Sequence, residues 1–97
     1  VSDVRESPAL ELMRLLEAGG ARLSYHDPHV SLLWLDGEAL PSVTLTDEEL
    51  RRADCVVVVT DHSSYDWERI GHEARLIVDT RNALRGVRAP RAAIVKL

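Results

Sequence analysis

The run of residues 55–59, "CVVVV", most constrains the fold, because all five positions are apolar and four of them are valine. A strand with one face in water alternates apolar and polar residues, whereas a strand covered on both faces is apolar throughout. The run therefore predicts a strand of a parallel sheet that lies between two layers of helices. The segments "RLIVD" at 75–79 and "AAIVKL" at 92–97 predict two more strands of this sheet.

Helical patterns separate the expected strands. Ser7-Pro8 is typical of a helix start, and Gly19-Gly20 ends the apolar spacing that follows it. A strand is then expected over residues 22–26, before Pro28. Residues 29–45 are expected to form a surface loop.

Two further helices are expected in the second half of the chain. Thr46 and Glu49 form a capping box, which predicts a helix over residues 47–53. Ser64 is expected to cap another helix, which carries Tyr65 and Trp67 and ends near His72. Strands that alternate with helices predict an α/β fold, a three-layer α/β/α sandwich around a parallel, Rossmann-like sheet. The 97 residues suit one domain over 1–97.

Charge and composition exclude several function classes. Sixteen acidic against twelve basic residues give a net charge of −4, and no run of Lys or Arg offers a nucleic-acid footprint. No apolar run approaches the roughly 18 residues of a membrane span. We therefore expect a cytoplasmic protein that binds neither nucleic acid nor membrane. Cys55 is the single cysteine, which excludes an internal disulfide and a thiolate metal cage, and we expect it to be buried and unreactive.

Polar residues gather where three of the expected strands end. Because the carboxyl ends of parallel strands meet at one edge of a sheet, these residues are a candidate ligand site. Arg81 stands out among them, since a guanidinium on a rigid mount binds phosphate or carboxylate with two parallel hydrogen bonds. A salt bridge from Arg81 to Asp79 or to a neighbouring acid is the equally weighted structural alternative. The three clusters are residues 25–29 (YHDPH), 60–64 (TDHSS) and 79–82 (DTRN).

Metal binding and nucleophilic catalysis are the weaker interpretations of these clusters. The histidines and aspartates match no metal-ligand spacing, and aspartates after strands commonly hold turns. A serine triad lacks the glycine pattern of a nucleophile elbow. We therefore predict no metal site and no catalytic residue. The residues considered were His26, Asp27, His29, Asp61, His62, Ser63 and Ser64.

Three segments carry a resemblance to a known family: "DVRESPALELMRLLEAGGARLSYHDPHV", "ADCVVVVTDHSSYDWERI" and "LIVDTRNALRG". In order and spacing, from Asp3 to about Gly86, the chain resembles the C-terminal, UDP-binding domain of the UDP-glucose/GDP-mannose dehydrogenase family. The resemblance implies NAD-dependent oxidation of the C6 alcohol of a nucleotide sugar to a carboxylate, in polysaccharide biosynthesis. It places NAD and the catalytic cysteine in upstream domains, and it implies a homo-oligomer. No cofactor is expected in this chain itself.

The resemblance also assigns individual residues. Arg81 and Asn82 match the DxRN segment, whose arginine contacts UDP, and Arg5 matches the DxRxSP segment that leads out of the nucleotide site. The segments "TDH" and "DTRN" are more similar to UDP-N-acetylhexosamine dehydrogenases than to UDP-glucose enzymes, which more often carry "TEW" and "DGRN". The family's strand order, 3-2-1-4-5, puts the central strand before Val1. The alternative function is a stand-alone nucleotide-binding or interaction domain without catalysis.

Overall fold

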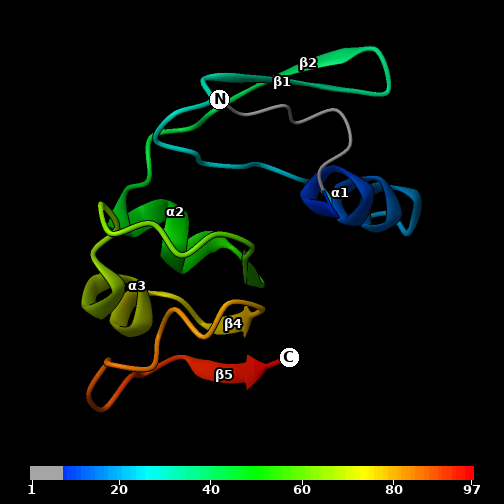
Figure 1. Ribbon diagram of the computed structural model, residues 1–97. Coiled ribbons are helices and arrows are strands. Elements are labelled where there is room, and N and C mark those ends of the chain that lie inside the picture. Colours follow the sequence, from blue (N-terminus) through cyan, green and yellow to red (C-terminus); the bar gives the residue numbers. More distant parts are fainter. Residues whose placement is uncertain (1–7) are drawn as a thin grey trace. The chain divides into compact units, whose positions relative to one another are not determined.

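The computed structural model describes residues 8–97, so the predicted helix cap at Ser7 lies outside the described residues. The chain divides into two compact units, Val1–Thr44 and Leu45–Leu97. None of the described helices is long and apolar enough to cross a membrane. The elements, labelled in Figure 1, are α1 (Pro8–Ala18), β1 (Leu32–Leu35), β2 (Glu38–Pro41), α2 (Asp47–Arg52), β3 (Val56–Val58), α3 (Trp67–Glu73), β4 (Leu76–Asp79) and β5 (Ala93–Lys96).

The first unit consists of α1 and the antiparallel hairpin β1–β2. The helix ends before Gly19-Gly20, as predicted. Residues 29–45 were expected to be a loop, and this prediction is wrong, because β1 and β2 pair across them. Asp36 and Gly37 both have positive φ, 51° and 84°, which matches the two-residue turn that joins twisted strands most readily.

The strand predicted over residues 22–26 is not formed. This segment is irregular, and its one described backbone hydrogen bond to the hairpin region runs from the Val43 N–H to the Tyr25 carbonyl (2.9 Å). A strand requires a ladder of such bonds to a neighbour, and the irregular segment has none within the described residues. Its end is fixed instead by Asp27, whose Oδ1 accepts the N–H groups of His29 (2.7 Å) and Val30 (3.0 Å).

The second unit is a parallel three-stranded sheet with α2 and α3 on the same face. The order is β3-β4-β5, and both pairs are parallel, which confirms the α/β class. The two helices pack their buried residues against one side of the sheet in a single core cluster, which includes Leu50, Ile70 and Ile77. In the family order 3-2-1-4-5 the strands at 55–59 and 76–79 are the third and the fourth and are not neighbours, so this predicted order is wrong here, because β3 and β4 pair directly. The third layer of the sandwich stays a prediction.

Of the two helix caps predicted in the second unit, one is confirmed and one is wrong. Thr46 caps α2 by accepting the N–H of Glu49 (3.1 Å), as predicted. The predicted cap of α3 at Ser64 is wrong: Asp66 accepts the N–H of Arg69 (3.1 Å) and α3 begins one residue later. The cap that forms sits two residues further along, at Asp66, and it sets the start of the helix.

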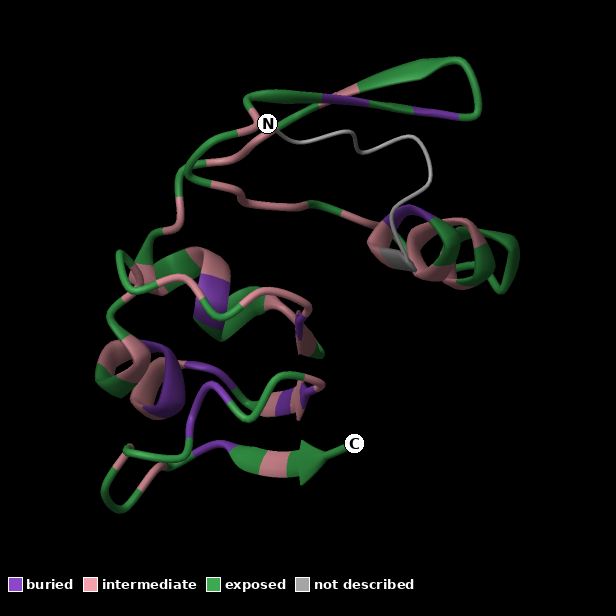
Figure 2. Cartoon of the chain, viewed as in Figure 1, coloured by how far each residue is buried: buried purple, intermediate pink, exposed green. Residues whose placement is uncertain are grey.

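Cys55 is exposed, so the prediction that it is buried is wrong. Side chains alternate along a strand, and Val56 and Val58 point into the core cluster with α2 and α3. Cys55 precedes Val56 and therefore lies on the opposite face of the sheet. Figure 2 shows the same contrast along β4, where buried and intermediate residues alternate.

Candidate functional site

The candidate site lies at the carboxyl edge of the sheet, where the loops after β3 and β4 come together. Val58 and Asp79 are partners at the ends of the two strands. Thr80 continues the pairing, since its N–H (3.2 Å) and its Oγ1 (2.6 Å) both donate to the carbonyl of Val58. Two of the three predicted polar clusters, 60–64 and 79–82, are therefore brought to one edge. The third, 25–29, belongs to the other compact unit.

Asp79 is the anchor of the loop after β4. Its side chain is fully buried, and its carboxylate accepts the N–H groups of Arg81 (3.1 Å), Ala83 (3.0 Å) and Leu84 (3.0 Å). Burial by itself would raise the pKa of the Asp79 carboxyl, but the backbone hydrogen bonds from residues 81–84 outweigh it and lower the pKa. The buried carboxylate therefore holds the backbone of residues 81–84 in one conformation.

Arg81 and Asn82 project outward from this anchored loop. Both are exposed, and Asn82 has a φ of 55°, a left-handed conformation that asparagine tolerates better than most residues. The Asp79 carboxylate is engaged by backbone N–H groups, so the predicted alternative, a salt bridge between Asp79 and Arg81, is not formed. Among residues 8–97 no partner for the Arg81 guanidinium is found. Its donors face solvent at the sheet edge.

Arg85 is a residue of this edge that the sequence interpretation missed. Its Nη1 pairs with the Asp61 carboxylate (2.9 Å) and also donates to the Asn82 carbonyl (2.8 Å). One side chain therefore ties the loop after β3 to the loop after β4. The only signal in the sequence is that Arg85 follows Asn82 by three residues, a spacing at which the two residues can come together in a single turn.

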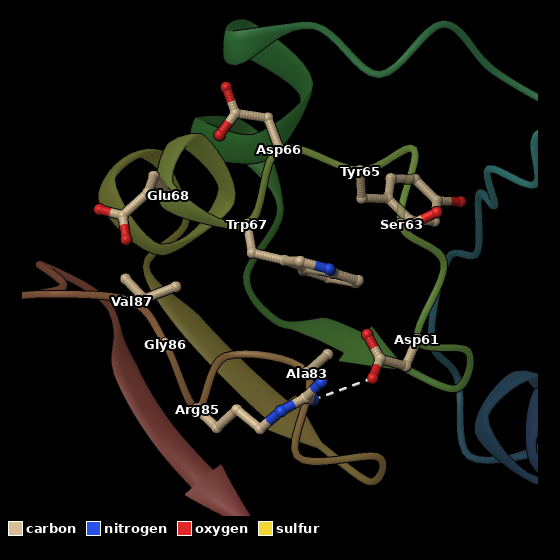
Figure 3. A pocket seen from close by; sticks show the side chains of 10 residues that line it. All are labelled: Asp61, Ser63, Tyr65, Asp66, Trp67, Glu68, Ala83, Arg85, Gly86 and Val87. Carbon is tan, nitrogen blue, oxygen red and sulfur yellow. Dashed lines mark hydrogen bonds and ion pairs between the residues drawn. The ribbon is translucent and has the colours of Figure 1, made fainter.

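A hollow of about 500 Å³ opens between the two loops and the start of α3. Figure 3 shows Trp67 projecting from the start of α3, near the Asp61–Arg85 pair. The Trp67 and Tyr65 rings contact each other, with centroids 5.1 Å apart. Three acidic side chains and one arginine line the hollow, so a diphosphate is better matched to the outward-facing Arg81. The complete lining is Asp61, Ser63, Tyr65, Asp66, Trp67, Glu68, Ala83, Arg85, Gly86 and Val87.

The remaining predicted residues divide into those outside the site and those outside the described chain. Arg5 lies outside the described residues. Asp27 holds a turn in the first unit, which is the structural role weighed for it above. Over residues 8–97, no group of three or more His, Cys, Asp or Glu side chains is arranged to hold a metal ion.

Comparison with known protein families shows to which family the chain belongs. Residues 1–86 match the family described as "UDP-glucose/GDP-mannose dehydrogenase family, UDP binding domain". The chain belongs to this family. In UDP-sugar dehydrogenases the matched region is the UDP-binding domain, so the resemblance of the three segments is confirmed over the expected range.

Curated relatives in the dehydrogenase family carry names of N-acetylated sugar substrates. A UDP-N-acetyl-D-mannosamine dehydrogenase of Methanococcus maripaludis is 35% identical over an alignment of 92 residues, and the match covers 87% of this chain and 20% of the relative. An NDP-N-acetyl-D-galactosaminuronic acid dehydrogenase of Ralstonia solanacearum is 33% identical over an alignment of 87 residues, and the match covers 84% of this chain and 19% of the relative. The chain thus spans about a fifth of the length of these proteins. No solved structure matches it.

Proposed function

We propose that this chain binds the UDP half of the substrate in an NAD-dependent UDP-N-acetylhexosamine 6-dehydrogenase. The single observation that carries the proposal is the match of residues 1–86 to the UDP-binding domain of the family. The geometry of the loop after β4 supports it, because the loop offers an arginine on a fixed backbone to an anionic ligand.

Arg81 is the residue proposed to contact the diphosphate or the uridine of the substrate. A guanidinium donates through a planar fork, and such a fork loses less entropy on binding when its backbone is already fixed. The hydrogen bonds that the backbone of the loop donates to the buried Asp79 carboxylate provide this fixation. Asn82, which is exposed beside it, and Arg5 complete the proposed contact set.

The preference for an N-acetylated sugar is proposed from the sequence and the relatives together. Residues 60–62 and 79–82 read "TDH" and "DTRN", as in UDP-N-acetylhexosamine enzymes. The named activities of the relatives from Methanococcus and Ralstonia also concern N-acetylated sugars. Oxidation itself, with NAD and the catalytic cysteine, is assigned to parts of the enzyme outside these residues. We also propose that the full enzyme is a cytoplasmic homo-oligomer.

The experiment that tests this function is a substrate comparison with the dehydrogenase that contains this chain. NADH formation is followed with UDP-N-acetylmannosamine, UDP-N-acetylgalactosamine and UDP-glucose. We expect kcat/KM to be highest for an N-acetylated substrate, and the 97-residue chain alone to form no NADH. A dehydrogenase that prefers UDP-glucose would contradict the sugar assignment, and one inactive on all three would contradict the function.

A further inference from the structure

The peptide group between Asn82 and Ala83 is held at both of its polar atoms. Its N–H, which belongs to Ala83, donates to Oδ1 of the buried Asp79 (3.0 Å). Its C=O, which belongs to Asn82, accepts a hydrogen bond from Nη1 of the exposed Arg85 (2.8 Å). The two groups lie in one rigid plane. A single hydrogen bond would let the plane tilt, and the second one removes this freedom.

Arg85 is itself held by the neighbouring loop. The same Nη1 atom pairs with the carboxylate of Asp61 (2.9 Å), which follows β3 (Figure 3). A chain of contacts therefore runs from the loop after β3, through the Arg85 guanidinium, to the carbonyl of Asn82 in the loop after β4. The orientation of that carbonyl depends on a side chain of another loop.

The backbone conformation of Asn82 shows why this second hold matters. Its φ of 55° lies in the left-handed region, and residues other than glycine stay there when surrounding contacts fix them. Asp79 binds N–H groups only, so it leaves the Asn82 carbonyl to Arg85. The backbone N–H of Arg85 also points to this carbonyl, but at 3.4 Å it makes the weaker bond. The Arg85 side chain is therefore the main contact of the carbonyl.

The Asp61–Arg85 pair contributes little to folding and much to geometry. The side chains of Arg85 and Asp61 are 61% and 30% exposed, and exposed ion pairs add little to stability. Arg81 directly precedes Asn82, and its N–H is held by Asp79. The conformation of Asn82 therefore sets the direction in which the loop presents both Arg81 and Asn82.

We propose that Asp61 and Arg85 are positioning residues for UDP binding, which hold the Asn82 peptide so that the loop presents Arg81 to the nucleotide in one geometry. This inference rests on the proposed function, since it requires that Arg81 contact UDP. Neither Asp61 nor Arg85 touches the nucleotide. Their effect on affinity comes from the loop, because a loop that is already ordered loses less entropy when the ligand binds.

Removing Asp61 separates positioning from simple charge effects, because the two predict opposite signs. Asp61→Ala deletes a negative charge near an anionic ligand, which by electrostatics alone strengthens UDP binding. It also releases Arg85, which would strengthen binding further if Arg85 contacted the ligand. Positioning predicts the reverse, a Kd for UDP about tenfold higher in the dehydrogenase that contains this chain. Arg85→Met should weaken binding by a similar factor, and the double variant no further, because both changes break the same chain of contacts.

A conservative variant and a matched control complete the set. Nη1 alone makes both side-chain contacts of Arg85, so a single ammonium group can replace it, and Arg85→Lys should recover most of the lost affinity. Arg81→Lys should not, because ligand binding there needs the planar fork. Arg88→Met removes the same charge from an exposed side chain that makes no ion pair among residues 8–97, and it should leave the Kd for UDP unchanged.

The test measures the Kd for UDP by calorimetry and the melting temperature of each variant. Unchanged or tighter binding in Asp61→Ala, in a native enzyme that oxidises UDP-sugars, would overturn the inference and leave the proposed function standing. Additive losses in the double variant would also overturn it, because the two residues would then act separately. A lower melting temperature with unchanged Kd would assign the pair to folding alone. A native enzyme that does not bind UDP would overturn the proposed function, and the inference with it.

Discussion

Replacing Asp79 by alanine tests whether this buried carboxylate holds the loop that presents Arg81. The change removes the acceptor of three backbone N–H groups. Two of them, on Ala83 and Leu84, belong to buried residues and are left without a partner. At about 1–3 kcal/mol for each buried donor that loses its acceptor, the free energy of unfolding falls by about 2–6 kcal/mol. That is a large part of the roughly 5–15 kcal/mol that typically stabilises a domain.

The assay is urea denaturation followed by circular dichroism, with two comparison variants. Asp79→Asn keeps one acceptor oxygen, so we expect it to lose about half as much stability as the alanine variant. Asp61→Ala removes the acid at the end of the neighbouring strand, where the carboxylate pairs with the exposed Arg85, and should cost less than about 1 kcal/mol. If Asp79→Ala were as stable as Asp61→Ala, the anchoring role would be refuted.

The same carboxylate predicts how stability depends on pH. The pKa of Asp79 is lowered in the folded state, so the folded protein holds this proton more weakly than the unfolded chain. Its stabilising contribution is therefore complete above the unfolded pKa of about 3.9, and is lost as the pH falls through the lower folded value. We expect the stability difference between the native chain and Asp79→Ala to shrink below about pH 4. A difference that stays constant down to pH 2 or so would contradict this.

Two further substitutions test the packing around the site. In Gly71→Ala the new Cβ would lie 2.9 Å from Cγ1 of Val87, so we expect a lower melting temperature despite the higher helix propensity of alanine. Gly86→Ala is the control, because no atom lies within 4 Å of its Cβ, and it should change the melting temperature little. Equal melting temperatures of the two variants would contradict this, because they would show that the loop with Val87 moves at no cost to make room for the new Cβ. Thr46→Ala removes the cap of α2 and should cost about 1 kcal/mol in urea denaturation, while Thr46→Ser should keep most of it; equal losses would argue against the hydroxyl as the cap.

The second unit was largely predictable because its signals are local. Apolar runs gave β3, β4 and β5, and the Thr46 capping box gave α2. The first unit was predicted less well, because a run such as residues 22–26 becomes a strand only where a neighbour supplies the hydrogen-bond ladder. The hairpin was not predicted although Asp36-Gly37 is a strong turn signal, because its strands are only four residues long and β2 ends at a proline.

The candidate site was predicted in position and only partly in detail. The loops after β3 and β4 were expected at one edge, and the parallel pairing confirms this. The sequence does not show which residues of "DTRN" are buried and which are exposed. In the structure Asp79 points inward and accepts backbone N–H groups, whereas Arg81 is exposed. Arg85 and Trp67 were not predicted as site residues, because contacts between side chains of different loops leave no repeating pattern in the sequence. Cys55 was misplaced because the continuous valine run does not say which face is covered within these residues.

The most direct measurement of the central claim is UDP-sugar affinity and melting temperature for the same Arg81→Ala variant of the dehydrogenase that contains this chain. A charge-assisted hydrogen bond is worth about 1.5–3 kcal/mol, so we predict a ten- to hundredfold weaker Kd for a UDP-N-acetylhexosamine. The melting temperature should be unchanged, because Arg81 is exposed. Arg81→Lys should also bind weakly, since a point charge does not reproduce the fork of the guanidinium. A lower melting temperature with unchanged affinity would contradict the account, because Arg81 would then stabilise the fold and not the substrate.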